Sequence, residues 1–255
     1  GLDGLEVLLR STQRSAWPIE RWRAFATHLG LTSVSSVATA CDRSLAEAEA
    51  LLRQYSAAYE HTYADPVTVV PFPCRADEDS ISSDDVVRRV AEGQAEFFVQ
   101  GPSGCGKTLL AGQAGRAFAA RGGVAVTLPI RDYAGSLKRL LDREVGLLIG
   151  RPATTVMGAA RHANRPLLFV IDGYNECAPS EQPSLSRGLA ALARVYEANL
   201  LVTSQCQVAR SDLLSLRAIM VAPAATETKT AIALNATGGD SLPDQLKPLL
   251  DSVTT

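Results

Sequence analysis

Eight residues near the middle of the chain have the types and spacing needed to bind phosphate. Their glycines let backbone N–H groups point inward at an anion, and a following helix would direct its positive dipole end at the same anion. Lys107 adds a mobile positive charge, and Thr108 offers a hydroxyl to a magnesium ion that bridges phosphates. We therefore predict a nucleoside triphosphate site with Mg²⁺. The residues follow the pattern G-x-x-x-x-G-K-[ST] and are Gly101, Pro102, Ser103, Gly104, Cys105, Gly106, Lys107 and Thr108.

A second polar group follows the apolar run at residues 167–171 and contains two acids, Asp172 and Glu176. A carboxylate at the tip of a strand beside a phosphate loop can hold magnesium, and a second carboxylate can orient and deprotonate an attacking water. We assign the first role to Asp172 and the second to Glu176. The predicted catalytic residues are thus Glu176, Lys107 and Asp172, and the predicted metal ligands are Thr108 and Asp172.

Strand and helix patterns alternate along the part of the chain that holds both groups. Short runs rich in valine, leucine and phenylalanine predict buried strands at residues 96–100, 124–128, 167–171, 199–203 and 218–222. Helices are expected at residues 107–120, within 135–163 and at 183–197. The alternation predicts an α/β fold of the P-loop NTPase type, with a parallel sheet covered by helices on both faces. Ligands of such sheets bind beyond the carboxyl ends of the strands, where the phosphate loop falls.

The regions outside this core differ in composition. The first part of the chain shows helical periodicity, with Ser44 and Glu47 spaced as a capping box. A stretch rich in proline, serine and acidic residues follows, as expected of a linker, and Ser83 then suits the N-cap of a helix. The expected segments are a helical interaction module at 1–65, a linker at 66–82, the NTPase core at 83–222 and the start of a helical lid at 223–255.

Bulk composition indicates a globular protein. The hydrophobic fraction of 46% is enough for a buried core, and a net charge of −2 does not by itself point to a nucleic-acid partner, although a local basic patch stays possible. No apolar run approaches the roughly 18 residues of a spanning helix, and no basic-then-apolar leader opens the chain, so we expect a cytoplasmic protein without a membrane partner. Five cysteines without C-x-x-C spacing argue against a disulfide framework or a zinc site. Because the chain begins at Gly1 rather than methionine, we expect it to be part of something longer.

The run from Phe169 to Glu176 resembles the Walker B signature of NACHT-type NTPases, which belong to the STAND class of AAA-related signalling ATPases. Residues 128–133 and 200–204 are similar to further segments of that family, and the likeness covers about residues 83–235. The resemblance implies a switch that is closed around ADP and self-associates when ATP is bound, as in bacterial immune-type defence. The helical module would then bind a protein partner. An excess of arginine over lysine also suggests a GC-rich bacterial gene.

Two residues depart from the family pattern. Asn175 stands where the family usually carries a second aspartate, which leaves Glu176 as the candidate base. Gln205 occupies the place of an arginine that senses the γ-phosphate, and glutamine donates a hydrogen bond there without offsetting charge. Slow hydrolysis, or binding without turnover, is therefore an open alternative. Arginines that could supply the missing charge, within the chain or across a subunit contact, are Arg131, Arg210 and Arg217.

Three functions compete on these residues. The chain lacks the Asn-Lys-x-Asp motif that reads guanine, which favours ATP and ADP as ligands. A small-molecule kinase would use the same loop, lysine and magnesium, but the helical module and linker leave less chain for an acceptor site. A nucleotide-gated scaffold without significant hydrolysis is the third reading, motivated by Asn175 and Gln205. We expect an ATP-hydrolysing signalling switch whose nucleotide state controls self-association.

Overall fold

A seven-stranded sheet organises the described part of the chain. The computed structural model describes residues 34–64, 71–76, 79–93, 96–205, 216–222, 228–231 and 234, with side chains described from residue 44 onward. The upstream part of the helical module, most of the expected lid and Arg210 lie outside these ranges. The chain divides into two compact units, residues 1–51 and 52–255, and the sheet belongs to the second.

Five strands of the sheet run parallel, as the sequence predicts. They lie in the order β7-β3-β6-β5-β4, so β3, the first of the five in sequence, lies between β7 and β6. The inner strands consist of almost continuously buried residues, which is typical of a parallel sheet covered on both faces. The strands are β3 (Phe97–Gln100), β4 (Val124–Pro129), β5 (Leu167–Asp172), β6 (Asn199–Ser204) and β7 (Arg217–Val221).

Residues 73–82, which we expected within a linker, instead form two further strands of the same sheet. Strand β1 (Pro73–Ala76) pairs antiparallel with β7 on one side and with β2 (Asp79–Ser82) on the other. The prolines and acids misled the prediction because Pro73 occupies the first position of its strand, where the ladder does not need its missing N–H. In β1, the buried residues Cys74 and Ala76 alternate with the exposed residues Pro73 and Arg75. This alternation of apolar and exposed positions is the signal of a strand in the sequence.

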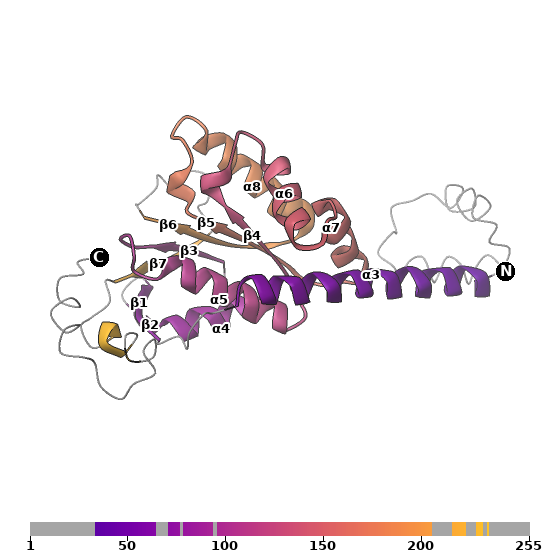
Figure 1. Cartoon of the computed structure of the whole chain (residues 1–255), viewed down its shortest axis with the longest axis horizontal. Helices are drawn as coiled ribbons and strands as arrows, with labels where there is room; N and C mark the ends of the chain where they lie inside the picture. Colours follow the sequence, from indigo (N-terminus) through magenta and orange to yellow (C-terminus); the bar gives the residue numbers. More distant parts are fainter. Residues whose placement is uncertain are drawn as a thin grey trace. The chain divides into compact units, whose positions relative to one another are not determined.

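Helices cover both faces of the sheet, as predicted. Figure 1 shows α6, α7 and α8 above the sheet and α4 and α5 below it. Helix α4 is capped by Ser82 and not, as predicted, by Ser83. Ser82 Oγ accepts from the Asp85 N–H, whereas Ser83 Oγ accepts from the Phe72 N–H at 3.1 Å. No helix among the described residues is long and apolar enough to cross a membrane. Their bounds are α4 (Ser83–Ala91), α5 (Lys107–Ala120), α6 (Leu137–Ile149), α7 (Ala153–His162) and α8 (Gln182–Tyr196).

The long helix α3 (Val34–Thr62) covers the free edge of β4 with its C-terminal turns. Tyr55 Oη donates to the Ala125 carbonyl of β4 at 2.9 Å, and Tyr59 Oη shares a 2.8 Å hydrogen bond with Thr127 Oγ1. Burial raises the pKa of both tyrosines, so their hydroxyls stay protonated. Tyr55 thus occupies a backbone carbonyl of an edge strand, a kind of group that could otherwise pair with another chain.

This packing differs from the expected module at residues 1–65. Residues from Leu52 onward belong with the sheet, because Leu52, Tyr55 and Tyr59 are buried in its core. Helix α3 also runs continuously through Ser44, so this serine lies inside a helix and does not cap one. Local spacing alone could not show which unit would bury the tyrosines. The division into an interaction module and an NTPase core otherwise stays a prediction.

Tyr59 fits against the sheet because α5 carries a glycine opposite it. A methyl group at Gly115 would collide with Tyr59 Oη and would lie 3.3 Å from its Cζ. Tyr59 itself has 0% of its surface exposed. The contact between α3 and the helix that follows the phosphate loop therefore depends on a missing side chain.

A double-mutant cycle tests this contact. We expect Gly115→Ala to lower the free energy of unfolding by about 1–3 kcal/mol through overpacking, and Tyr59→Phe to lower it by about 1 kcal/mol through loss of the hydrogen bond to Thr127. The double variant should be more stable than the sum of these losses predicts, because Phe removes the colliding oxygen. Urea unfolding of the four proteins measures the coupling, and strictly additive losses would contradict the contact.

Candidate functional site

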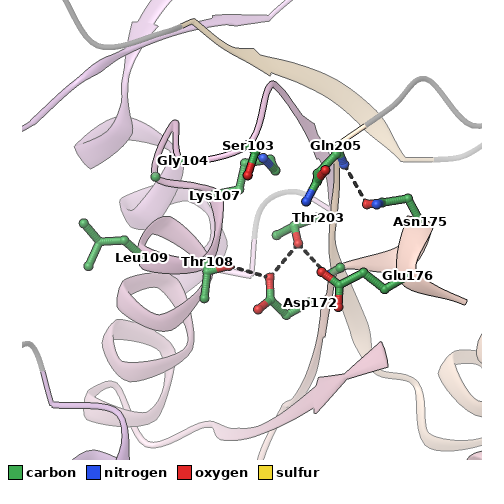
Figure 2. A pocket seen from close by; sticks show the side chains of 12 residues that line it. Ser103, Gly104, Lys107, Thr108, Leu109, Asp172, Asn175, Glu176, Thr203 and Gln205 are labelled. Atoms are coloured by element: carbon green, nitrogen blue, oxygen red, sulfur yellow. Dashed lines mark hydrogen bonds between the residues drawn. The ribbon is translucent and has the colours of Figure 1, made fainter. Parts of the chain in front are cut away.

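The cleft that contains most of the predicted site residues lies at the carboxyl ends of β5 and β6, beside the start of α5. Its volume of about 290 Å³ is near the lower end of the roughly 300–1,000 Å³ typical of small-molecule sites. Figure 2 shows the side chains directed into it from the loop, from β5 and from the tip of β6. The lining residues are Ser103, Gly104, Gly106, Lys107, Thr108, Leu109, Asp172, Gly173, Asn175, Glu176, Thr203 and Gln205.

The glycines of the loop are required by its backbone and its contacts. Gly104 and Gly106 adopt φ of 76° and 96°, a region that disfavours other residues. A Cβ on Gly101 would lie 2.6 Å from the Val221 carbonyl oxygen and 2.7 Å from Cys105 Sγ. Of the predicted loop residues, three do not line the cleft: Gly101, Pro102 and Cys105.

A residue from the overlooked hairpin region supports the loop. The Phe72 ring lies under the loop, since a Cβ on Gly106 would lie 3.2 Å from its Cζ. Next to it, burial and the neighbouring Cys105 thiol raise the pKa of Cys74 to about 11, so Cys74 is an uncharged thiol. Cys74, Cys105 and Cys177 are buried free thiols.

Lys107 is the first residue of α5 and is 92% buried, with 8% of its surface exposed. Its ammonium group donates to the Pro102 carbonyl at 2.6 Å and lies 3.7 Å from Cys105 Sγ. The lysine charge is thus held within the curve of the loop. This is the arrangement in which a cation can neutralise phosphate oxygens that accept from the surrounding backbone.

The two sequence motifs meet through a single hydrogen bond. Thr108 Oγ1 donates to Asp172 Oδ1 at 3.1 Å, although the residues are 64 positions apart. Strand β5 is not the direct neighbour of the loop strand β3, because β6 lies between them. Helix α5 closes that distance, since it extends from the loop across β6, β5 and β4.

The turn Tyr174–Glu176 after β5 is fixed by a buried aromatic residue. Tyr174 has 2% of its surface exposed, contacts Phe98 edge-on and hydrogen-bonds to Ser186 Oγ of α8. Gly173 has φ of 76°, and a Cβ there would lie 2.8 Å from the Glu176 Cδ. The Asp-Gly sequence is therefore more than a simple turn: the glycine makes the space that the Glu176 carboxylate occupies.

Polar residues at the end of β6 hold this turn in place. Thr203, with 1% of its surface exposed, donates from Oγ1 to Asp172 Oδ1 at 2.7 Å and accepts from the Gly173 N–H at 2.9 Å. Asn175 Oδ1 accepts from the Gln205 N–H at 2.7 Å and from Ser204 Oγ at 3.3 Å. Sequence reasoning assigned no role to Thr203. Its signal was a hydroxyl residue ending a strand next to the one that ends in Asp172.

The arginines considered as extra charges are placed differently. Arg217 is the first residue of β7, in register with Phe97, so it lies at the amino ends of the strands and pairs with Asp79 at 3.9 Å. It cannot serve the cleft of its own chain. Arg131 follows β4, is exposed and lies 3.9 Å from Asp132, outside the cleft lining. The described lining residues therefore supply one cation, Lys107, and two carboxylates.

The donor set fits a nucleotide with magnesium. A hydroxyl and a carboxylate in mutual contact, Thr108 and Asp172, are the hard oxygen ligands that Mg²⁺ prefers. The ion usually retains waters and takes its remaining ligands from phosphates, so a protein site needs few residues. Among the described residues no cluster of three or more His, Cys, Asp or Glu suggests a metal held by protein groups alone. Part of the loop, Lys107 and the two candidate metal ligands all line one cleft.

Comparisons with known proteins yield similarity in fold only. Neither a protein-family model nor a curated protein matches the chain. Among solved structures, Cdc6p from Pyrobaculum aerophilum is 14% identical with a TM-score of 0.48, over 75% of this chain and 58% of that one. The Aeropyrum pernix Orc1 protein, solved with DNA, is 16% identical with a TM-score of 0.47, over 65% and 53%. AMPPCP-bound DnaA from Aquifex aeolicus is 15% identical with a TM-score of 0.44, over 67% and 56%.

The chain thus spans little more than half the length of these proteins. The assignment of a P-loop NTPase type of α/β fold rests on the strand order, the glycine loop and the helix that follows it.

Proposed function

We propose that this protein binds ATP with Mg²⁺ in the cleft between α5 and the tips of β5 and β6, and hydrolyses it to drive a signalling switch. One observation carries the proposal. The Thr108 hydroxyl and the Asp172 carboxylate, which come from the two separate motifs, are 3.1 Å apart beside Lys107. Strand, glycine loop, lysine, hydroxyl and strand-end carboxylate are the components that P-loop NTPases use to bind a triphosphate.

Each group has a binding role in this proposal. Loop residues in the cleft lining, Ser103, Gly104 and Gly106, cradle the phosphates with backbone N–H groups, and Lys107 neutralises the β- and γ-phosphate oxygens. Thr108 and Asp172 hold the magnesium ion, which when bound supplies charge neutralisation at the same oxygens. Gln205 offers its side-chain amide as a hydrogen-bond donor from the far side of the cleft, where Figure 2 shows it directed inward.

Hydrolysis then needs a base, and Glu176 is the candidate. Its carboxylate accepts a proton from a water molecule as the water oxygen forms a bond to the γ-phosphorus. The bond from that phosphorus to the β–γ bridging oxygen breaks, and its electron pair leaves with ADP. Glu176 passes the proton on to phosphate or solvent. The cleft's single described cation supports slow turnover, because little positive charge offsets the transition state.

The switch itself rests on the resemblance to NACHT-type NTPases. In this proposal ADP maintains a closed state, ATP promotes self-association, and the helical module recruits a protein partner in a bacterial immune-type system. Helix α3 supports such a link because it is one helix from Val34 to Thr62 and so contains residues of both units. A scaffold that binds ATP without hydrolysing it is the second candidate, favoured by the neutral Asn175 and Gln205 at the site.

Lys107→Ala should weaken binding of ATP and of ADP by roughly 10- to 100-fold, since a charge-assisted contact of about 1.5–3 kcal/mol is lost. Lys138→Ala is the matched control, because Lys138 is an exposed residue of α6 that pairs with Asp142. It should bind like the wild type. Isothermal titration calorimetry of the three proteins measures the affinities. Equal affinities would contradict the placement of the nucleotide in this cleft.

Glu176→Gln should lower ATP turnover by roughly 10²- to 10⁴-fold, the usual contribution of a general base, and should leave ATP affinity near the wild-type value. Glu60→Gln, on the exposed side of α3, is the control and should keep full turnover. Phosphate release in the presence of Mg²⁺ measures the rate. Unchanged turnover in Glu176→Gln rejects Glu176 as the base, whereas a wild type that binds ATP without turnover favours the scaffold.

Nucleotide state should change the solution mass. We expect a smaller species with ADP and a larger one with a non-hydrolysable ATP analogue, because the proposed switch couples the triphosphate to self-association. Light scattering on the wild type, with Lys107→Ala as a control that should not respond, measures this. An identical mass in both nucleotides would contradict the switch while leaving ATP binding intact.

A further inference from the structure

The turn that carries Glu176 is joined to the tip of β6 by two adjacent sets of hydrogen bonds. The first set uses Thr203, which bonds to the Asp172 carboxylate and to the Gly173 N–H. The second uses Asn175, whose side-chain oxygen accepts from Ser204 Oγ and from the Gln205 N–H. We name this pair of sets the β5–β6 clasp. Figure 2 shows it across the cleft from the phosphate loop.

The second set differs from the first in what it holds. Thr203 restrains the candidate metal ligand, which lies at the base of the cleft and is also held by Thr108. Asn175 restrains the backbone of Gln205, an exposed residue just beyond β6, and the 2.7 Å bond to its N–H is the shorter of the two bonds that Asn175 accepts. With that N–H fixed, the Gln205 side chain is directed into the cleft.

The residues on either side of Asn175 link it to the core and to the candidate base. Tyr174 is buried and hydrogen-bonded to Ser186 of α8, and Glu176 follows directly in the same turn. A shift of the turn would therefore move the candidate base and the Gln205 amide together. An acceptor at this position therefore couples two groups of the cleft lining, Glu176 and Gln205.

An amide suits this position better than a carboxylate. Both would accept from Ser204 and Gln205, but a carboxylate would add a third negative charge beside Asp172 and Glu176, in a cleft whose described lining holds one lysine. Like charges at such short range repel strongly, and a triphosphate would add to that repulsion. The neutral Asn175 therefore keeps the hydrogen bonds without the charge.

We propose that Asn175 is a positioning residue that acts through Gln205. By binding the backbone N–H of Gln205, it fixes the side-chain amide of Gln205 relative to the Glu176 carboxylate. The side-chain amide and the carboxylate then meet the γ-phosphate and its attacking water in one geometry. This inference rests on the proposed function. It also assigns a joint role to the two residues at which the sequence departs from the family pattern.

Steady-state ATP turnover of wild type, Asn175→Ala and Asn175→Asp tests the role. Asn175→Ala should lower kcat by roughly 10- to 100-fold, the effect of displacing a reacting group by about 1 Å, with ADP affinity unchanged. Asn175→Asp should retain most of the wild-type kcat, because both donors keep an acceptor, and should raise KM for ATP through charge repulsion. This division between kcat and KM is not expected of a residue that only stabilises the fold.

Gln205→Ala completes the design. It should lower kcat about as much as Asn175→Ala, and the double variant should lose little more, because both changes remove the same placed amide. Full kcat in Asn175→Ala, equal losses of kcat in Asn175→Ala and Asn175→Asp, or multiplicative losses in the double variant would each overturn the proposal.

The result for the wild type separates this inference from the proposed function. Absence of turnover in the wild type would reject hydrolysis itself. The role of Asn175 is then decided by binding: the wild type should prefer a non-hydrolysable ATP analogue over ADP, and Asn175→Ala should lose that preference. An undiminished preference in Asn175→Ala would overturn the positioning role independently of hydrolysis.

Discussion

The Asp172 carboxylate is the point on which the candidate site depends. One of its oxygens accepts from Thr108 of α5 and from Thr203 of β6, at 3.1 and 2.7 Å. These two bonds join the phosphate-loop helix, the acidic strand and the strand between them. The loop follows β3 and the carboxylate ends β5, and these two strands are not neighbours in the sheet. The hydrogen bonds therefore connect groups that strand pairing does not bring together. The same carboxylate is the group best suited to hold a metal ion, so structure and chemistry place competing demands on it.

Elements distant in sequence pack against the phosphate loop and its helix α5. The hairpin of β1 and β2 brings Phe72 beneath the loop glycine Gly106, and α3 fits Tyr59 against Gly115 of the loop helix. Both contacts need a glycine, because a side chain at either position would meet an aromatic ring or its hydroxyl. The loop helix is thus fixed at its first turn by the hairpin and further along by α3. A change in how α3 packs would reach the phosphate loop through one rigid helix.

The sequence predicted the parallel strands and the helices around them well, because buried strands and amphipathic helices leave strong periodic patterns. It also predicted that the loop residues Lys107 and Thr108 and the acidic residue Asp172 would face one cleft, since the carboxyl ends of parallel strands share an edge. It missed β1 and β2, where Pro73 and acidic residues obscured an alternation only a few residues long. It also missed Thr203, whose role depends on β6 lying next to β5, and strand order has no local signature in sequence.

A structure of the protein with Mn²⁺ and a non-hydrolysable ATP analogue tests the central claim most directly, because anomalous scattering locates the metal independently of the phosphates. The account predicts the metal between Thr108 and Asp172, the β- and γ-phosphates within the loop and beside Lys107, and the Gln205 amide on the γ-phosphate side. Phosphates bound elsewhere, or a metal that does not contact Thr108 or Asp172 directly or through one water, would contradict it.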